Sequence, residues 1–169
     1  DLMLNAETVS ALCIVNPLKK IHLWRAMGSE SHEAILPSFP PTLRSLSWTH
    51  VNNDNACYDL CQQCPQLRTI YLNRAMNISD YSMRLFSIHM KHLKRLVLEL
   101  AGNVTDIGLC YLAGCPKLRI VSLRNEIKFQ EGTDRMTLLA KLPYRIVDGA
   151  TQDSSDLFSK PIPFKWLTQ

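Results

Sequence analysis

A spaced leucine pattern recurs five times along the sequence and constrains the fold more than any other feature. The pattern is Leu-x-x-Leu-x-Leu, in which Ile, Val or Trp sometimes replaces a later leucine, and its first leucines lie 25, 24, 26 and 25 positions apart. A pattern that returns at such a period is typical of repeat architectures, in which each unit buries its apolar side chains against its neighbours. The five first leucines are Leu18, Leu43, Leu67, Leu93 and Leu118.

Each occurrence ends in alternating apolar and polar residues, which indicates a short strand with one buried face. Between occurrences the apolar residues follow helical spacing, most clearly in residues 103–116, where Thr105 or Asp106 can cap a helix and Pro116 ends it. Stacked units of this kind place parallel strands on a concave face and helices on a convex face. The sequence therefore predicts an α/β fold, a short horseshoe. The inward stripe of the clearest helix is expected to be Leu109, Leu112 and Ala113.

Composition indicates a chain with a sizeable core. Of its 169 residues, 46% are hydrophobic and only 20% are charged, which excludes a disordered chain. No apolar run approaches the roughly 18 residues of a membrane span, and the first residues lack the basic start of a signal peptide. Because the chain opens on Asp1, we expect a fragment or processed form of a longer protein. A net charge of +4 is small for a nucleic-acid binder, so we expect no nucleic-acid partner.

The six cysteines leave two interpretations open. Three disulfides would suit a small secreted domain that lacks a core, whereas free thiols would suit a chain with an ample core in a reducing compartment. The hydrophobic content favours free, buried thiols and a cytoplasmic or nuclear location. The cysteines are Cys13, Cys57, Cys61, Cys64, Cys110 and Cys115.

Two segments carry a family resemblance, residues 60–67 (LCQQCPQL) and residues 112–118 (LAGCPKL), the second preceded by VTDIGL at 104–109. These segments resemble the cysteine-containing leucine-rich repeats of F-box/leucine-rich-repeat proteins. The resemblance extends over roughly residues 7–148, although the sequence itself contains no F-box. In other repeats the cysteine position holds Val15, Pro40 and Met90.

The resemblance implies a leucine-rich-repeat solenoid of about five to six repeats over residues 1–148. It also implies a non-catalytic protein–protein interaction module, the substrate-recognition part of an F-box-type cullin-RING ubiquitin ligase receptor. The cullin-RING adaptor would then be a partner only if an F-box lies upstream. The alternative is a non-catalytic scaffold subunit of a larger protein assembly. Neither function requires a cofactor.

The strand residues between the leucines are expected to point outward on the concave face, where a protein substrate or assembly partner would bind. This row contains Trp, Tyr and Arg, the residue types that dominate interface energetics. The alternative is that a strand face carries such β-forming residues in any case. The expected partner-binding residues are Lys20, His22, Trp24, Tyr71, Asn73, Arg95, Glu99 and Arg124.

Two residue groups have spacings that could serve metal chemistry. Cys57, Cys61 and Cys64 have the spacing that holds an iron–sulfur cluster in radical S-adenosylmethionine enzymes. The repeat, however, places them on one face of a helix, which favours core thiols. His89 and His92 could lie one helical turn apart, as zinc ligands would, but they fall at a helix-to-strand turn and no further ligand is near them in sequence.

A basic residue follows the first leucine of every repeat, at Lys19, Arg44, Arg68, Lys94 and Arg119. These residues are either a solvated edge of the sheet or a contact for an acidic protein surface.

The period stops after Asp148, where residues 149–156 have the composition of a turn-rich linker. Residues 157–169 are apolar and contain prolines that exclude a regular helix. We predict that this tail caps the exposed end of the solenoid, the alternative being a segment that docks on a partner.

Overall fold

The computed structural model describes residues 18–23, 38–51, 53–124, 131–132 and 134–148. Within these residues there are ten helices and strands, two strands followed by a regular alternation of helix and strand. They are β1 (Lys20–Leu23), β2 (Ser45–Thr49), α2 (Asp54–Gln63), β3 (Thr69–Asn73), α3 (Asp80–His89), β4 (Arg95–Glu99), α4 (Asp106–Leu112), β5 (Ile120–Arg124), α5 (Arg135–Lys141) and β6 (Arg145–Asp148).

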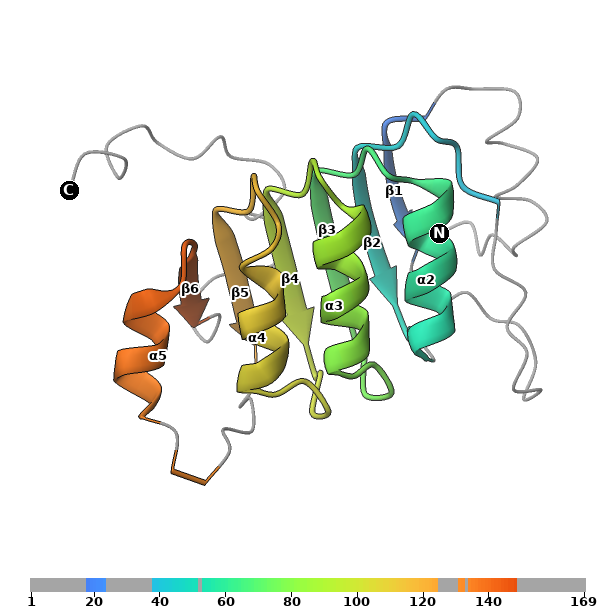
Figure 1. Ribbon diagram of the computed structural model, residues 1–169. Helices are drawn as coiled ribbons and strands as arrows, with labels where there is room; N and C mark the ends of the chain where they lie inside the picture. Colours follow the sequence, from blue (N-terminus) through green and yellow to red (C-terminus); the bar gives the residue numbers. More distant parts are fainter. Residues whose placement is uncertain (1–17, 24–37, 52, 125–130, 133, 149–169) are drawn as a thin grey trace.

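The strands form one six-stranded parallel sheet, in which their order across the sheet is their order along the chain. Residues one repeat apart are register partners, so Ile70 lies opposite Leu96, which in turn lies opposite Val121. The helices α2 to α5 all lie on one side of the sheet (Figure 1). The predicted α/β arrangement of parallel strands with helices on one face is therefore confirmed. None of the helices in the described residues is long and apolar enough to cross a bilayer.

The repeated leucine positions form the core between sheet and helices. The first positions of the three central repeats, Leu43, Leu67 and Leu93, have no exposed surface. The cysteine position is buried as well, whether it holds Cys64, Met90 or another residue. Stacking buries side chains that a single unit would leave in water, at roughly 25 cal/mol for each Å² of apolar surface. The second and third positions add Ile21, Leu46, Ile70, Leu96, Val121, Trp48, Leu72, Leu98 and Leu123.

Each of the three central helices begins with a polar cap at the same point of the repeat. The side chain of Asn53 accepts a hydrogen bond from the amide of Ala56, and Ser79 and Thr105 cap α3 and α4 in a similar way. These bonds satisfy amides that have no partner within the helix. The cap at Thr105 was one of the two predicted. The same helix ends earlier than expected, however, and Ala113 is an exposed residue at its C-cap instead of part of the inward stripe.

The carboxylate at the first position of one helix accepts hydrogen bonds from the residue that caps the next helix. Asp54 accepts hydrogen bonds from the Ser79 amide at 2.9 Å and the Ser79 hydroxyl at 2.7 Å. Asp80 accepts from the Thr105 amide at 2.7 Å and the Thr105 hydroxyl at 2.6 Å. A Cβ atom added at Gly108 would lie 2.3 Å from Asp80 Oδ1, so this close approach requires glycine there. We call this series the capping ladder. It couples consecutive units through polar contacts, in addition to the shared core.

The last unit, α5 and β6, lacks the leucine pattern and lies within the residues 1–148 over which five to six repeats are expected. It is attached to the fifth unit by parallel pairing of β5 with β6 and by Tyr144, a buried residue whose hydroxyl donates to the Leu109 carbonyl at 2.5 Å. Its strand ends at Asp148, where the period was predicted to stop. The predicted linker, residues 149–156, and the tail predicted to cap the solenoid, residues 157–169, lie outside the described residues.

Candidate partner-binding face

The side of the sheet opposite the helices carries the residues that alternate with the core leucines, and we call it the polar face. Register pairing aligns these residues in rows across the strands, so that His22, Ser47 and Tyr71 are successive partners. Apart from Trp24, which lies outside the described residues, all of the predicted partner-binding residues belong to it. The polar face consists of Lys20, His22, Ser45, Ser47, Thr49, Thr69, Tyr71, Asn73, Arg95, Val97, Glu99, Ile120, Ser122 and Arg124.

The middle row of the polar face is more buried than the sequence suggests. Tyr71, Val97 and Ser122 expose 6%, 0% and 2% of their surfaces, although the sequence predicts an outward-facing row. Val97 lies between the other two on neighbouring strands, and the long side chains of Arg95 and Glu99 stand on the same face two positions away. The accessible part of the central face therefore consists of long polar side chains at the strand ends.

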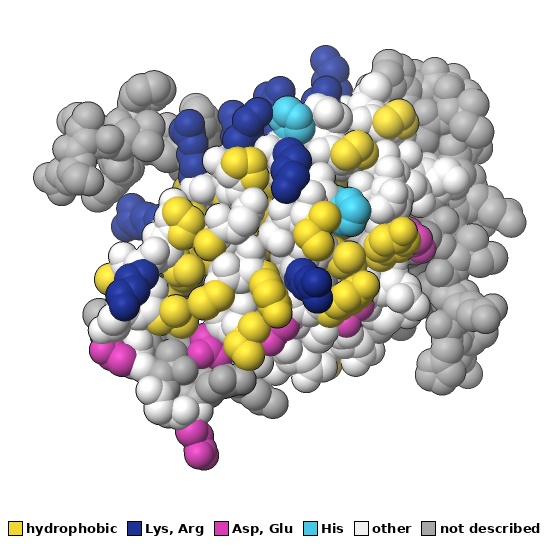
Figure 2. Space-filling view, viewed as in Figure 1, with side chains coloured by type: hydrophobic (Ala, Val, Ile, Leu, Met, Phe, Trp, Pro, Cys, Tyr) yellow, Lys and Arg dark blue, Asp and Glu magenta, His cyan; other side chains and the backbone are white. Residues whose placement is uncertain are grey.

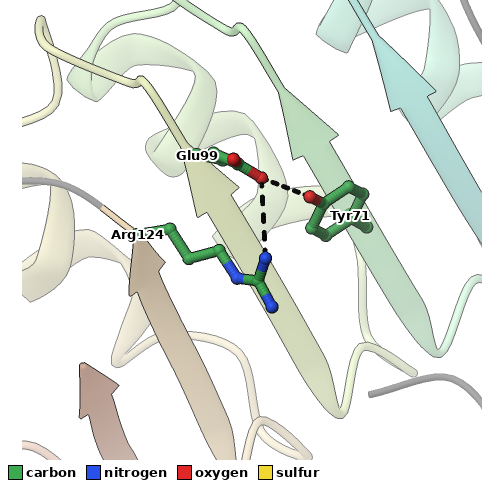
Figure 3. A network of polar contacts seen from close by, with 3 residues as sticks. All are labelled: Tyr71, Glu99 and Arg124. Carbon is green, nitrogen blue, oxygen red and sulfur yellow. Dashed lines mark hydrogen bonds and ion pairs between the residues drawn. The ribbon is translucent and has the colours of Figure 1, made fainter. Parts of the chain in front are cut away.

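Three of the predicted residues form one polar cluster across β3, β4 and β5 (Figure 3). The Tyr71 hydroxyl donates to Glu99 Oε2, and Arg124 Nη1 lies 3.9 Å from the same oxygen. The Arg124 guanidinium carbon is 6.0 Å from the centre of the Tyr71 ring, within reach of a cation–π contact. One carboxylate thus holds an aromatic and a guanidinium side chain next to each other.

Within the described residues, the cluster's hydrogen bond and ion pair involve none of the remaining predicted residues. Lys20 and His22 are exposed on β1, three strands from Glu99. Burial lowers the pKa of His22, and the charge of Lys20 lowers it further. Asn73 and Arg95 are half-buried, and burial lowers the pKa of the Arg95 guanidinium. The polar face therefore has a central cluster of interacting side chains around Glu99. Lys20 and His22 form a separate basic group on β1.

Sequence reasoning named each member of the cluster but not their contact. Glu99 and Arg124 are register partners of opposite charge, which a comparison of equivalent repeat positions reveals. Tyr71 is diagonal to Glu99, at a separation of 28 residues instead of one repeat, so the pattern alone does not pair them.

The phenol of Tyr71 is expected to titrate near pH 12 instead of its ordinary pKa of 10.0. Burial is the main cause, because it disfavours the phenolate, and the hydrogen bond and charge of Glu99 act in the same direction. Since the folded pKa is above the unfolded value, the stabilising contribution is complete below about pH 10 and is lost as the pH rises through 12. Absorbance titration of phenolate, compared with Tyr71→Phe, checks this. If the absorbance step near pH 10 were smaller in Tyr71→Phe than in the parent, Tyr71 would titrate at its ordinary pKa and the prediction would be wrong.

The thiols that could hold a cluster lie instead in the apolar core. Cys57 and Cys61 are buried residues of α2, and Cys64 donates from its sulfur to the Pro40 carbonyl at 3.4 Å. Burial raises the pKa of Cys57 to about 12 and also raises that of Cys61. Because metals bind thiolates, this setting favours neutral core thiols. In the part of the chain that the structure describes, no group of three or more His, Cys, Asp and Glu side chains is placed to hold a metal ion.

The two histidines at the end of α3 face different surroundings. The ring of His89 meets that of Tyr58 edge to face, with 6.3 Å between their centres. His92 lies in the following turn, with Nδ1 3.2 Å from the Lys117 ammonium group. An adjacent cation is a poor neighbour for a zinc ligand, so these contacts favour two independent turn histidines.

Alkylation of the folded protein is expected to reach Cys110 well before the other described cysteines. Cys110 is exposed on α4, whereas Cys57, Cys61, Cys64 and Cys115 are buried free thiols. The expectation that all cysteines are buried is therefore wrong at Cys110. Peptide mass spectrometry after brief iodoacetamide treatment measures the difference, and treatment in denaturant supplies the control in which all of them react. Equal labelling of Cys57 and Cys110 in the folded state would contradict it.

No protein-family model matches this sequence, and the comparison with curated proteins finds no relative.

Proposed function

We propose that this chain is a protein-binding module, a short leucine-rich-repeat solenoid that holds a partner protein on its polar face and performs no chemistry of its own. The Leu-x-x-Leu-x-Leu repeats and the stacked parallel strands support the solenoid. The observation that carries the binding function is the cluster in which Glu99 positions Tyr71 and Arg124 side by side.

This cluster has two properties of an effective protein contact. Tyr and Arg are among the residues that most often dominate binding energy, and they do so best near the centre of an interface. Their positions are also set before a partner arrives, because Arg124 and Glu99 are already half-buried and in contact. A partner then orders fewer side chains on binding, which reduces the entropic cost of association.

The resemblance to F-box/leucine-rich-repeat proteins suggests the role in which a partner is bound. We propose the substrate-recognition part of a cullin-RING ubiquitin ligase receptor, in which this chain presents a protein substrate and other subunits transfer ubiquitin. The adaptor of that ligase would bind only to an F-box elsewhere in the parent protein. The second candidate is a scaffold that is a fixed subunit of a larger assembly.

Quantitative affinity capture tests the polar face. Arg124→Ala should reduce recovery of the specific partner at least about tenfold, because it removes a central Arg from the interface. Arg84→Ala is the matched control, since Arg84 is an exposed arginine on α3, on the helix side of the sheet. Equal recovery with both variants would contradict binding at the polar face.

The fate of the captured partner separates the two roles. For a ligase receptor, co-purification with the cullin-RING adaptor and proteasome-dependent loss of the partner are expected. For a scaffold, the partner should remain at constant abundance in a stoichiometric complex. A full-length gene product without an F-box that never binds the adaptor would remove the ligase proposal.

A further inference from the structure

A row of five basic residues runs along the edge of the sheet where the strands begin, on a surface separate from the polar face. Main-chain hydrogen bonds join its neighbouring members, from Arg44 N to Lys19 O at 2.8 Å through to Arg119 N to Lys94 O at 3.0 Å. Neighbouring members are therefore held one strand spacing apart, about 4.8 Å. We call this row the basic ridge: Lys19, Arg44, Arg68, Lys94 and Arg119.

Many of the basic side chains gather along the edge of the sheet where the strands begin, although exposed arginines such as Arg74 and Arg84 lie elsewhere. Figure 2 shows Lys and Arg side chains gathered along the upper edge and acidic side chains along the lower edge. Asp54, Asp80 and Asp106 lie in the first turns of their helices, and Asp106 is buried. Within the described residues, no side chain of the basic ridge forms an ion pair with a carboxylate. Arg44 Nη1 donates to the Gln66 carbonyl at 3.4 Å, and among the described residues the ridge is a line of like charges with no carboxylate in ion-pair contact.

His92 reports the positive potential of this edge. It lies in the turn before Lys94, and its Nδ1 atom is 3.2 Å from Lys117 Nζ. The positive charge of Lys117 is the largest cause that lowers the pKa of His92, and Arg68 and Arg44 of the basic ridge lower it further. A negatively charged partner bound to the ridge would raise the pKa of His92.

We propose that the basic ridge docks an acidic helix of a partner protein, laid across the strands with one carboxylate for each ridge residue. An α-helix rises about 5.4 Å per turn, so carboxylates one turn apart nearly match the strand spacing of about 4.8 Å. Flexible Lys and Arg stems can absorb the small difference. Because this surface is not the polar face, the proposal stands independently of the partner site proposed above.

A nucleic acid fits the basic ridge less well. Proteins that bind single strands usually combine a basic groove with aromatic side chains on which bases stack. The turn segments 64–69, 90–95 and 115–120, which carry the centre of the ridge, contain no Phe, Trp or Tyr. The net charge of +4 is also low for such a role.

Direct binding measurements with the full chain test the proposal. The probe is a fluorescent helical peptide of about five turns with one Glu per turn, and its counterpart carries Gln at the same positions. The acidic peptide is expected to bind with an affinity that falls as salt rises, and the Gln peptide to bind at least about tenfold more weakly. The double variant R68E/K94E should bind the acidic peptide at least about tenfold more weakly than the parent protein does. The control R74E/R84E changes the net charge equally, at exposed arginines outside the ridge, and should bind within about twofold of the parent.

A second measurement on the unmodified protein does not depend on the folding of any variant. Saturation with the acidic peptide is expected to raise the pKa of His92, followed by NMR titration of its imidazole. No binding of the acidic peptide, equal losses in both double variants, or an unchanged His92 pKa at saturation would overturn the proposal. Tighter binding of a single-stranded oligonucleotide or of phosphatidylserine vesicles than of the peptide would overturn it as well.

Discussion

Replacing Phe86 with alanine is expected to lower the free energy of unfolding by about 3–5 kcal/mol. Phe86 is fully buried on α3, between α2 and α4, and among the described residues it is the largest of the completely buried side chains. Its removal loses the transfer free energy of a phenyl group and leaves a cavity in a core that both neighbouring units share. The effect is large against the total stability of a domain, which is typically about 5–15 kcal/mol.

Urea unfolding monitored by circular dichroism measures this loss. Ile88→Ala is the matched control, because Ile88 lies on the same helix with 48% of its surface exposed. The control should change the free energy of unfolding by less than about 0.5 kcal/mol. Similar midpoints for Phe86→Ala and Ile88→Ala would show that the helix side of the core does not hold the units together.

Asp80→Ala is expected to lower the free energy of unfolding by about 3 kcal/mol, the second largest effect. The substitution removes the carboxylate that accepts both the amide and the hydroxyl of Thr105. Hydrogen bonds to charged groups contribute about 1.5–3 kcal/mol each, and the partly buried setting places the sum toward the lower end. The first turn of α4 loses its connection to the preceding unit.

Two comparisons make the test of the capping ladder specific. Asp59→Ala removes a carboxylate from α2 at a position outside the ladder and should have little effect. Thr105→Val keeps the amide bond to Asp80 but loses the hydroxyl bond and the side-chain cap, so it should cost part of the total, roughly 1–2 kcal/mol. A loss for Asp80→Ala no greater than that for Asp59→Ala would contradict a stabilising ladder.

The main architecture was predictable because one spacing determines several levels of structure. A period of 24 to 26 residues fixes which residues are register partners, and the alternation within each repeat fixes which face they occupy. Leu67 and Leu93 are buried for this reason, and Cys64 and Met90 share a core position despite their different chemistry. The sixth unit was harder to recognise because residues 143–148 do not contain the leucine triplet.

The sequence predicts which residues belong to the polar face, but it does not predict how their side chains contact one another. Alternation shows that Tyr71, Glu99 and Arg124 share a side of the sheet, because that depends only on the strand period. Their contact depends on which rotamers three long side chains adopt together, and on a diagonal relation between strands that no periodicity specifies. Val97 is likewise fully buried although the alternation places it in an outward-facing row, and the pattern does not predict that burial.

The agreement between strand order and chain order has an evolutionary consequence. In such a stack, duplication or loss of a gene segment encoding one whole period rejoins equivalent points of the chain and disturbs no distant pairing. Insertions of a few residues inside a strand, by contrast, would turn leucines toward the wrong side. Natural variants of this protein should therefore differ in length by complete repeats, and shorter insertions should be confined to the connecting turns.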